Sequence, residues 1–107
     1  MNKRNLAGLL GMCRRAGRLV IGFDAAVNLC EEPSVLLMVA CDASPRTVKE
    51  LRFHVKQHPL YTAPLTKDEL AATLGLQKPV AVMATSDEGF AKAMRQYLIE
   101  EESYHDD

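Results

Sequence analysis

Apolar residues in the first part of the chain recur at the spacing of an amphipathic helix. The periodic positions are Leu6, Leu9, Leu10 and Cys13. They predict a helix over residues 4–16 that Gly17 ends, because glycine readily adopts the left-handed conformation beyond a helix. A short strand over residues 18–22 is expected next, and Asp24 is placed to cap a second helix that runs to about residue 30.

Two apolar runs, over residues 35–40 and 79–84, lack the alternation of a half-exposed strand. Such runs are typical of central strands that helices cover on both faces. A shorter strand is expected over residues 60–62, between two polar segments that have the character of helices. Helices are therefore expected on both sides of the sheet.

Polar residues at capping positions mark the helices of the second half. Ser44 with Pro45 predicts a helix that starts there and runs to about residue 58. Thr66 and Glu69, three residues apart, form a capping box for a helix that Gly75 ends.

The last helix is expected to begin at Ser86 or Asp87. Its inward positions are Phe90, Ala91, Met94 and Leu98. Helices that alternate with short strands predict an α/β fold, namely a three-layer α/β/α sandwich with a four-stranded sheet of mixed strand direction. We expect one domain over residues 1–107, with residues 100–107 as a frayed acidic end.

The composition is that of one soluble globular domain. The chain has 107 residues, of which 48% are hydrophobic and 25% charged, with a formal net charge of −1. A pI near 6.3 excludes the strongly basic character that marks many nucleic-acid binders, so any such site must be local. The sequence contains no apolar run of the ~20 residues that span a bilayer. We therefore expect a protein that does not enter membranes. We also expect it to be a monomer.

Cysteine usage indicates a reducing compartment. Cys13, Cys30 and Cys41 are odd in number and fit no metal or redox spacing, so we expect reduced, buried thiols in the cytoplasm. Lys3 and Arg4 before an apolar run imitate an export signal, but the run is short and arginines follow at once, so export is rejected.

Candidate enzyme chemistry is sparse. Cys41 and Asp42, which end a predicted strand, could act as nucleophile and acid, but no base is placed beside them. His54 and His58 share a helix face without a third metal ligand, and the glycines form no phosphate-binding loop. Asp87 and Glu88 suit the first turn of a helix better than an acid–base pair. We expect no catalysis, no metal and no cofactor.

Positive charge is concentrated in two segments. Residues 1–18 contain five cations and no acid, and residues 45–56 contain four more. The cations are Lys3, Arg4, Arg14, Arg15 and Arg18, then Arg46, Lys49, Arg52 and Lys56. Such positions either neutralise phosphates or simply solvate a helix face, and the sequence leaves both interpretations open.

Three blocks of sequence occur in order: LLGMCRRAGRLVIG over residues 9–22, CDASP over 41–45 and LAATLGLQKPVAVMATSDEGFAKAM over 70–94. They resemble the small bacterial YlxQ-like branch of the ribosomal protein family that includes L-seven-Ae and L-thirty-e. The resemblance covers the chain from about residue 5 to residue 98 and implies an α/β/α sandwich. It also implies noncatalytic binding of kink-turn or similar structured RNA, possible contact with a ribosome-associated protein, and a link to translation.

The helix start that meets RNA in that family has the form Gly-Thr-Asn-Glu-x-x-Lys. In this sequence Gly22 matches, and Phe23, Asp24, Ala25 and Asn28 stand at the other four positions. Asp24 introduces an anion, Ala25 lacks the carboxylate and Asn28 lacks the positive charge. Because a charge-assisted hydrogen bond contributes ~1.5–3 kcal/mol, we expect weaker kink-turn binding than the family pattern would give.

Other positions of the resemblance keep the chemistry of RNA binding. The family's second RNA-facing loop corresponds to Leu76, Gln77 and Lys78. We expect Arg14, Arg15 and Arg18 to supply phosphate contacts close to Gly22. Phe23, if exposed, can stack on an extruded base, whereas its structural alternative is a hydrophobic staple at the helix start.

Two hypotheses follow. The first is a noncatalytic RNA-binding protein in which the arginines hold phosphates and the face comprises Gly22, Phe23, Asp24, Asn28, Leu76, Gln77 and Lys78. The second is a diverged module of the same fold that has lost kink-turn binding and binds a protein partner through that face. An exposed apolar patch at Phe23 favours the second, and a positive strip joining Arg14, Arg15 and Lys78 favours the first.

Overall fold

The computed structural model describes residues 3–56 and 58–100. The helices in this part of the chain are α1 (Lys3–Arg15), α2 (Phe23–Leu29), α3 (Pro45–His54), α4 (Lys67–Leu74) and α5 (Glu88–Arg95). The strands are β1 (Val20–Ile21), β2 (Leu36–Ala40), β3 (Leu60–Ala63), β4 (Val82–Thr85) and β5 (Ile99–Glu100). The predicted alternation of helices and strands, and with it the α/β fold, is confirmed.

The strands form one mixed sheet in the order β1-β4-β2-β3-β5. β2 and β3 are parallel, whereas β4 pairs antiparallel with both β2 and β1, and β5 pairs antiparallel with β3. The prediction of a mixed sheet is confirmed, but the sheet has five strands rather than four.

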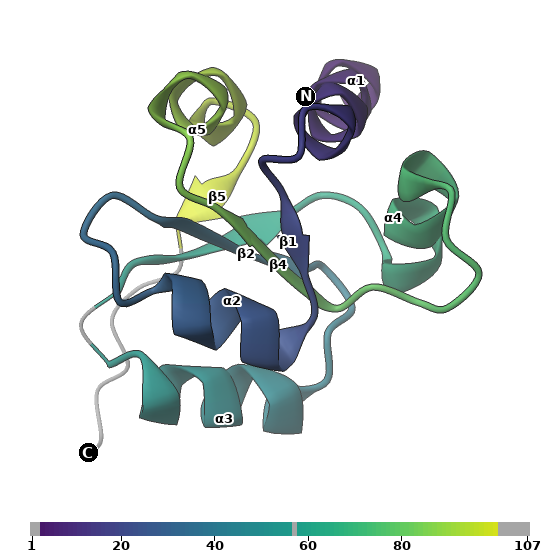
Figure 1. Ribbon diagram of the computed structural model, residues 1–107. Coiled ribbons are helices and arrows are strands. Elements are labelled where there is room, and N and C mark those ends of the chain that lie inside the picture. Colours follow the sequence, from purple (N-terminus) through teal and green to yellow (C-terminus); the bar gives the residue numbers. More distant parts are fainter. Residues whose placement is uncertain (1–2, 57, 101–107) are drawn as a thin grey trace.

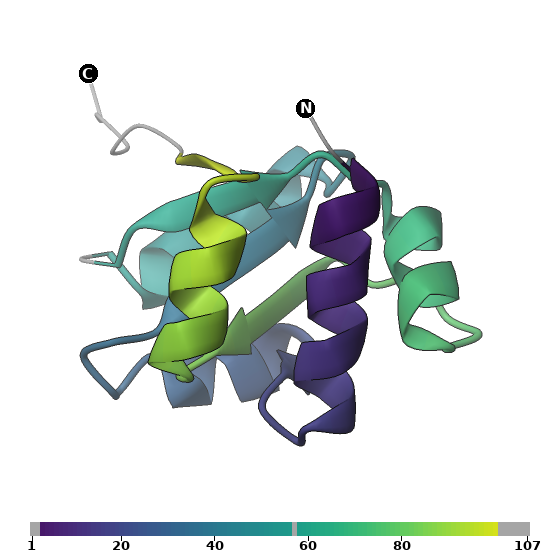
Figure 2. The same cartoon turned by 90° about the horizontal axis from the view of Figure 1, so that it is seen from above.

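Helices cover both faces of the sheet, which gives the predicted three layers. α1, α4 and α5 lie on one face, and α2 and α3 lie on the other (Figure 1). Figure 2 shows α5, α1 and α4 side by side along the first face.

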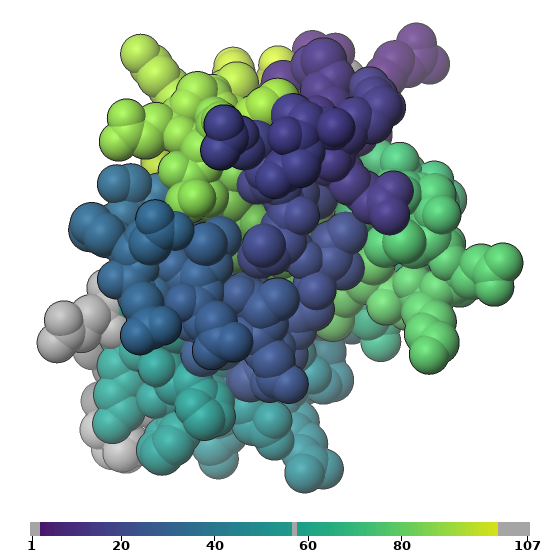
Figure 3. All heavy atoms as spheres, in the orientation of Figure 1, coloured from purple at the N-terminus to yellow at the C-terminus, as the bar shows by residue number. Residues whose placement is uncertain are grey.

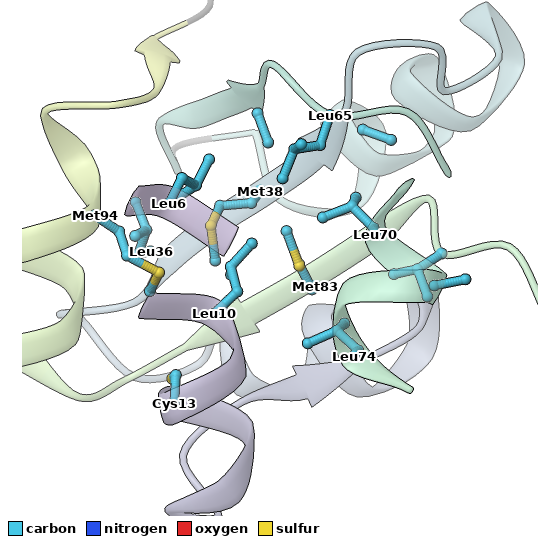
Figure 4. Packing of buried hydrophobic residues seen from close by; sticks show 14 of the residues in the cluster. Leu6, Leu10, Cys13, Leu36, Met38, Leu65, Leu70, Leu74, Met83 and Met94 are labelled. Carbon is cyan, nitrogen blue, oxygen red and sulfur yellow. The ribbon is translucent and has the colours of Figure 1, made fainter. Parts of the chain in front are cut away.

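The central strand β2 supplies both halves of the core. Its alternate residues Leu36 and Met38 join the cluster under α1, α4 and α5, as Figure 4 shows. Leu37 and Val39 join the second cluster, under α2 and α3. Because neighbouring side chains of a strand point to opposite faces, a strand buried at every position needs apolar residues throughout, as predicted.

The predicted caps form in the structure. The Ser44 hydroxyl accepts a hydrogen bond from the Thr47 amide at 3.1 Å, with Pro45 as the first residue of α3. Thr66 and Glu69 form the reciprocal capping box, and Gly75 ends α4 at a φ of +70°. These bonds satisfy amides that the first turn of a helix leaves without an intrahelical partner.

Several predicted boundaries are wrong. α2 begins after Gly22 rather than at an Asp24 cap, because the Ala26 amide already donates to the Gly22 oxygen at 3.0 Å. α3 ends at His54, and Leu98 lies beyond the end of α5, although it still packs against the first core cluster. Glu100 belongs to a strand instead of a frayed end, because it pairs with Tyr61 at the edge of the sheet. The rest of the predicted acidic end, residues 101–107, lies outside the described residues.

The cysteines differ in burial. Cys13 is fully buried as predicted, but the prediction of buried thiols is wrong for Cys30, which is half-buried, and for Cys41, which is exposed. Cys41 is exposed because it follows the last residue of β2, where the chain leaves the covered part of the sheet.

Candidate nucleic-acid interface

Arg14 ties the end of α1 to the end of α4. Its Nη1 donates a hydrogen bond to the main-chain oxygen of Leu74, the last residue of α4, at 2.8 Å. Carbonyls in the last turn of a helix have no intrahelical donor, and a nearby cation is favourable there. The contact places the arginines at the end of α1 beside the segment that starts at Gly75 and contains Leu76, Gln77 and Lys78.

A second contact brings the start of α2 to the other end of that segment. The Gly22 amide donates to the Val82 oxygen at 2.9 Å, directly after β1 has paired with β4. Val82 is the first residue of β4, so the α4–β4 segment runs from the neighbourhood of Arg14 to that of Gly22. The end of α1, the start of α2 and the α4–β4 segment therefore meet on one face of the molecule.

Figure 3 shows this face, which we call the α1–α2–loop face. The dark end of α1 and the start of α2 occupy its middle, and the green segment after α4 projects on one side. The segments that meet here, residues 14–28 and 76–78, contain the ten residues predicted from the sequence: Arg14, Arg15, Arg18, Gly22, Phe23, Asp24, Asn28, Leu76, Gln77 and Lys78. The structure therefore gathers residues that lie more than fifty positions apart in the sequence.

The positively charged side chains of this face differ in the ion pairs and hydrogen bonds that they form. Arg18 Nε lies 3.7 Å from Asp87 Oδ2, and the Arg18 side chain is 64% exposed, so this ion pair is weak. Arg15 and Lys78 are exposed and pair with no acid in residues 3–56 or 58–100. A guanidinium has five N–H donors, so Arg14 retains further donors while it holds Leu74.

The start of α2 carries little RNA-binding chemistry of the family type. Asp24 and Asn28 are exposed, and Asp24 is the second residue of the helix. An acid in the first turn stabilises a helix, which gives Asp24 a structural explanation. Ala25 is exposed as well. Because α2 contains no lysine or arginine, its exposed side carries no positive charge.

Phe23 is held by packing. It is half-buried, packs against the second core cluster and meets His54 of α3 edge-to-face, with ring centroids 5.7 Å apart. Leu76 is likewise half-buried, against the first cluster. Both residues therefore help to position the face. The large exposed hydrophobic residues of the described chain are Met12, Phe53 and Ile99.

The enzyme candidates are not assembled into a site. Asp42 Oδ1 accepts a hydrogen bond from the Lys67 amide at 2.8 Å, so this carboxylate supports the start of α4 beside the exposed Cys41. Asp87 caps α5 by accepting from the Phe90 amide at 2.9 Å. Burial raises the pKa of the Cys13 thiol and that of Cys30, which makes both poorer nucleophiles.

The two histidines point to different partners. His54 contacts the rings of Phe23 and Phe53, whereas His58 Nε2 is 3.1 Å from the Cys30 oxygen. Within residues 3–56 and 58–100, no group of three histidine, cysteine or acidic side chains is placed to hold a metal ion.

Two features of this region were not predicted from the sequence. The bond from Arg14 to Leu74 joins helices that are sixty residues apart, and no local pattern signals it. The contact between Phe23 and His54 links α2 to α3, which carries the second group of cations.

Comparison with known proteins supports the fold. No protein-family model matches the chain, and no curated protein matches it. A solved structure of a protein of unknown function from Bacillus halodurans is similar over 90% of this chain and 97% of its own, with a TM-score of 0.73 and 25% sequence identity. Among the described residues, no helix is long and apolar enough to cross a membrane.

Proposed function

We propose that this protein is a noncatalytic RNA-binding protein of the kink-turn-binding ribosomal type, acting as a cytoplasmic monomer associated with the ribosome or translation. The observation that carries the proposal is that Arg15, at the end of α1, and Lys78, in the α4–β4 segment that Arg14 contacts at Leu74, are both exposed and have no acidic partner in the described chain. The other end of that segment meets Gly22 through the bond to Val82. The sequence resemblance assigns RNA contacts to the start of α2 and to residues 76–78.

The distribution of charge on the α1–α2–loop face determines how RNA would lie on it. Arg15 and Lys78 bind phosphates, which supply most of the affinity of such complexes. Asp24 repels phosphates, so the backbone of the RNA passes the end of α1 and the α4–β4 segment. Gln77 and Asn28 then offer amide groups to base edges or sugar hydroxyls.

The protein-binding alternative has less support on this face. It calls for an exposed apolar patch around Phe23, but that ring is half-buried against His54 and the second core cluster. The exposed hydrophobic residues Met12, Phe53 and Ile99 lie on three different elements. Phe53 approaches Phe23 through the ring of His54, so the exposed apolar surface near Phe23 is one ring rather than a broad patch.

The test is a binding measurement with a kink-turn RNA and an unkinked duplex of matched composition across a salt series. The double variant Arg15→Ala/Lys78→Ala is compared with Arg4→Ala, which removes an exposed arginine eleven residues and about 16 Å away along α1. We expect preference for the kinked RNA, and a salt slope that falls by about two in the double variant. Equal binding of the two RNAs, or a double variant that behaves like Arg4→Ala, would contradict the proposal.

A further inference from the structure

Phe53 is an exposed aromatic ring surrounded by positive charge. Its relative exposure is 68%, the largest among the exposed large hydrophobic residues of the described chain. The Lys56 Nζ lies 5.3 Å from the centroid of the ring, and Lys49 and Arg52 stand on the same helix. A single exposed apolar side chain is ordinary on a protein surface, so a role in binding has to be argued from the cations and the cavity beside the ring.

A cavity of about 870 Å³ adjoins this ring between α3 and β3. Its apolar floor includes Val48, Leu51 and Leu60, and its cations are Lys49, Arg52 and Lys56. Within residues 3–56 and 58–100, no acidic side chain lines it. Arg46, at the start of α3, is instead paired with Glu50 at 3.1 Å. Three positive charges thus remain beside an apolar floor and an aromatic wall.

The same residues continue to the α1–α2–loop face. Phe53 and Lys56 also line a cavity of about 570 Å³ that they share with Asn28 of α2. The rings of Phe23, His54 and Phe53 meet edge-to-face, with centroids 5.7 Å and 5.5 Å apart. Glu31 lines this smaller cavity and disfavours phosphate there, so phosphates are directed to the cations of α3.

We infer that α3 binds an unpaired segment of the RNA, with a base stacked on Phe53 and the adjoining phosphates held by Lys49, Arg52 and Lys56. Every base presents a flat π-face, so an exposed aromatic ring among cations binds single strands without reading their sequence. An acidic peptide would meet the same cations, but a nucleic acid combines a stacking base with a phosphate at every residue, which matches a ring flanked by cations more closely. The inference rests on the proposed function, since the strand it describes continues from the α1–α2–loop face.

The test compares three RNAs: a kink-turn helix, the same helix with an unpaired extension added at each end in turn, and the unpaired strand alone. The variants are Phe53→Ala, Phe53→Tyr, which keeps an aromatic ring, and Ile99→Ala, which shortens another exposed apolar residue on β5. All of these positions are exposed, so the variants are expected to fold. A poly-glutamate peptide serves as the acidic competitor.

We expect one of the extensions to tighten binding by the wild-type protein about tenfold, the order of magnitude of one stacked base. Phe53→Ala loses this gain and binds the bare helix as before, whereas Phe53→Tyr and Ile99→Ala keep it. Lys49→Ala/Lys56→Ala lowers the salt slope for the unpaired strand by about 1.4.

The inference is overturned if neither extension tightens binding, if the gain survives in Phe53→Ala, or if poly-glutamate displaces the unpaired strand more readily than RNA of equal charge does. Failure of the proposed function has a different signature, because kinked and unkinked helices then bind equally. In that case the unpaired strand alone still reports whether Phe53 binds a base.

Discussion

Arg14 holds the main-chain oxygen of Leu74 at 2.8 Å, whereas its neighbour Arg15 is exposed and has no acidic partner in the described chain. Two adjacent arginines, both expected to contact RNA, therefore have different tasks. Arg14 joins α1 to α4 and fixes the position of the α4–β4 segment. Arg15 is free to bind a phosphate.

This difference predicts effects of unequal size on stability for two alanine substitutions. Arg14→Ala removes a partly buried, charge-assisted hydrogen bond and should lower the free energy of unfolding by about 1–2 kcal/mol. Arg15→Ala should change it by less than about 0.5 kcal/mol, as is usual for exposed positions. Urea denaturation of the three proteins measures both values, and equal stabilities of the two variants would show that the contact with Leu74 contributes nothing.

Gly22 adopts a conformation that other residues avoid. Its φ is +107° and its ψ is 158°, a region that is essentially restricted to glycine. Gly22→Ala should therefore destabilise the protein by about 1–3 kcal/mol, although an added Cβ would meet no atom within 4 Å. It should also weaken RNA binding, because the turn positions the start of α2.

Gly8 provides the matched control for this substitution. It lies exposed within α1, and an added Cβ would likewise meet nothing within 4 Å. Gly8→Ala should stabilise the protein by up to about 1 kcal/mol, because alanine favours a helix. If thermal denaturation shows the same sign for both substitutions, backbone strain is not the cause.

The capping box of α4 predicts a dependence of stability on pH. The Thr66 amide donates to the Glu69 carboxylate at 2.9 Å, and this bond lowers the pKa of Glu69 from its usual value of 4.5. A lowered carboxyl pKa stabilises the folded state above the unfolded pKa, and that contribution is lost as the pH falls through the folded pKa. The melting temperature of the wild type should thus exceed that of Glu69→Ala at neutral pH, and the difference should shrink below pH 4.5.

Glu69→Gln distinguishes this titration from a general effect of acid. Its amide oxygen accepts the same hydrogen bond and does not titrate in this range. The difference in melting temperature between Glu69→Gln and Glu69→Ala should therefore stay constant with pH. If this difference shrinks at low pH as much as the difference between the wild type and Glu69→Ala does, other carboxylates cause the effect.

The three thiols should react with an aromatic disulfide reagent in the order Cys41, Cys30, Cys13. Cys41 is exposed, while burial both shields Cys13 and raises the pKa of its thiol. Cys30 is half-buried, and burial raises its pKa as well. Folded protein should show one fast phase that Cys41→Ser removes, and unfolded protein should show all three thiols at once. A fast phase that persists in Cys41→Ser would contradict the burial of the other two.

The sequence predicts the parts of this fold that depend on local chemistry. The capping box at Thr66, the proline start of α3 and the fully apolar strand β2 need only neighbouring residues, and all three are present in the structure. β5 was missed because Leu98 continues the helical spacing of Met94, and the pairing of Ile99 with Thr62 is a long-range contact.

The same distinction applies to the candidate interface. The family resemblance marked the start of α2 and residues 76–78 of the α1–α2–loop face, and the concentration of positive charge in residues 1–18 marked the arginines at the end of α1. The different roles of Arg14 and Arg15 were not predicted, because the role of Arg14 depends on the carbonyl of Leu74, which is sixty residues away in the sequence. Phe53 was not singled out either, since its exposure depends on how α3 is rotated on the sheet.

The most direct test of the central claim is a titration of isotopically labelled protein with a kink-turn RNA, followed through the backbone amide resonances. We predict that the largest shifts occur at Arg15, Gly22, Gln77 and Lys78, with small shifts along the outer side of α5. Shifts that are absent at saturating RNA, or that concentrate on α5 and leave Gly22 and Lys78 unchanged, would contradict the account.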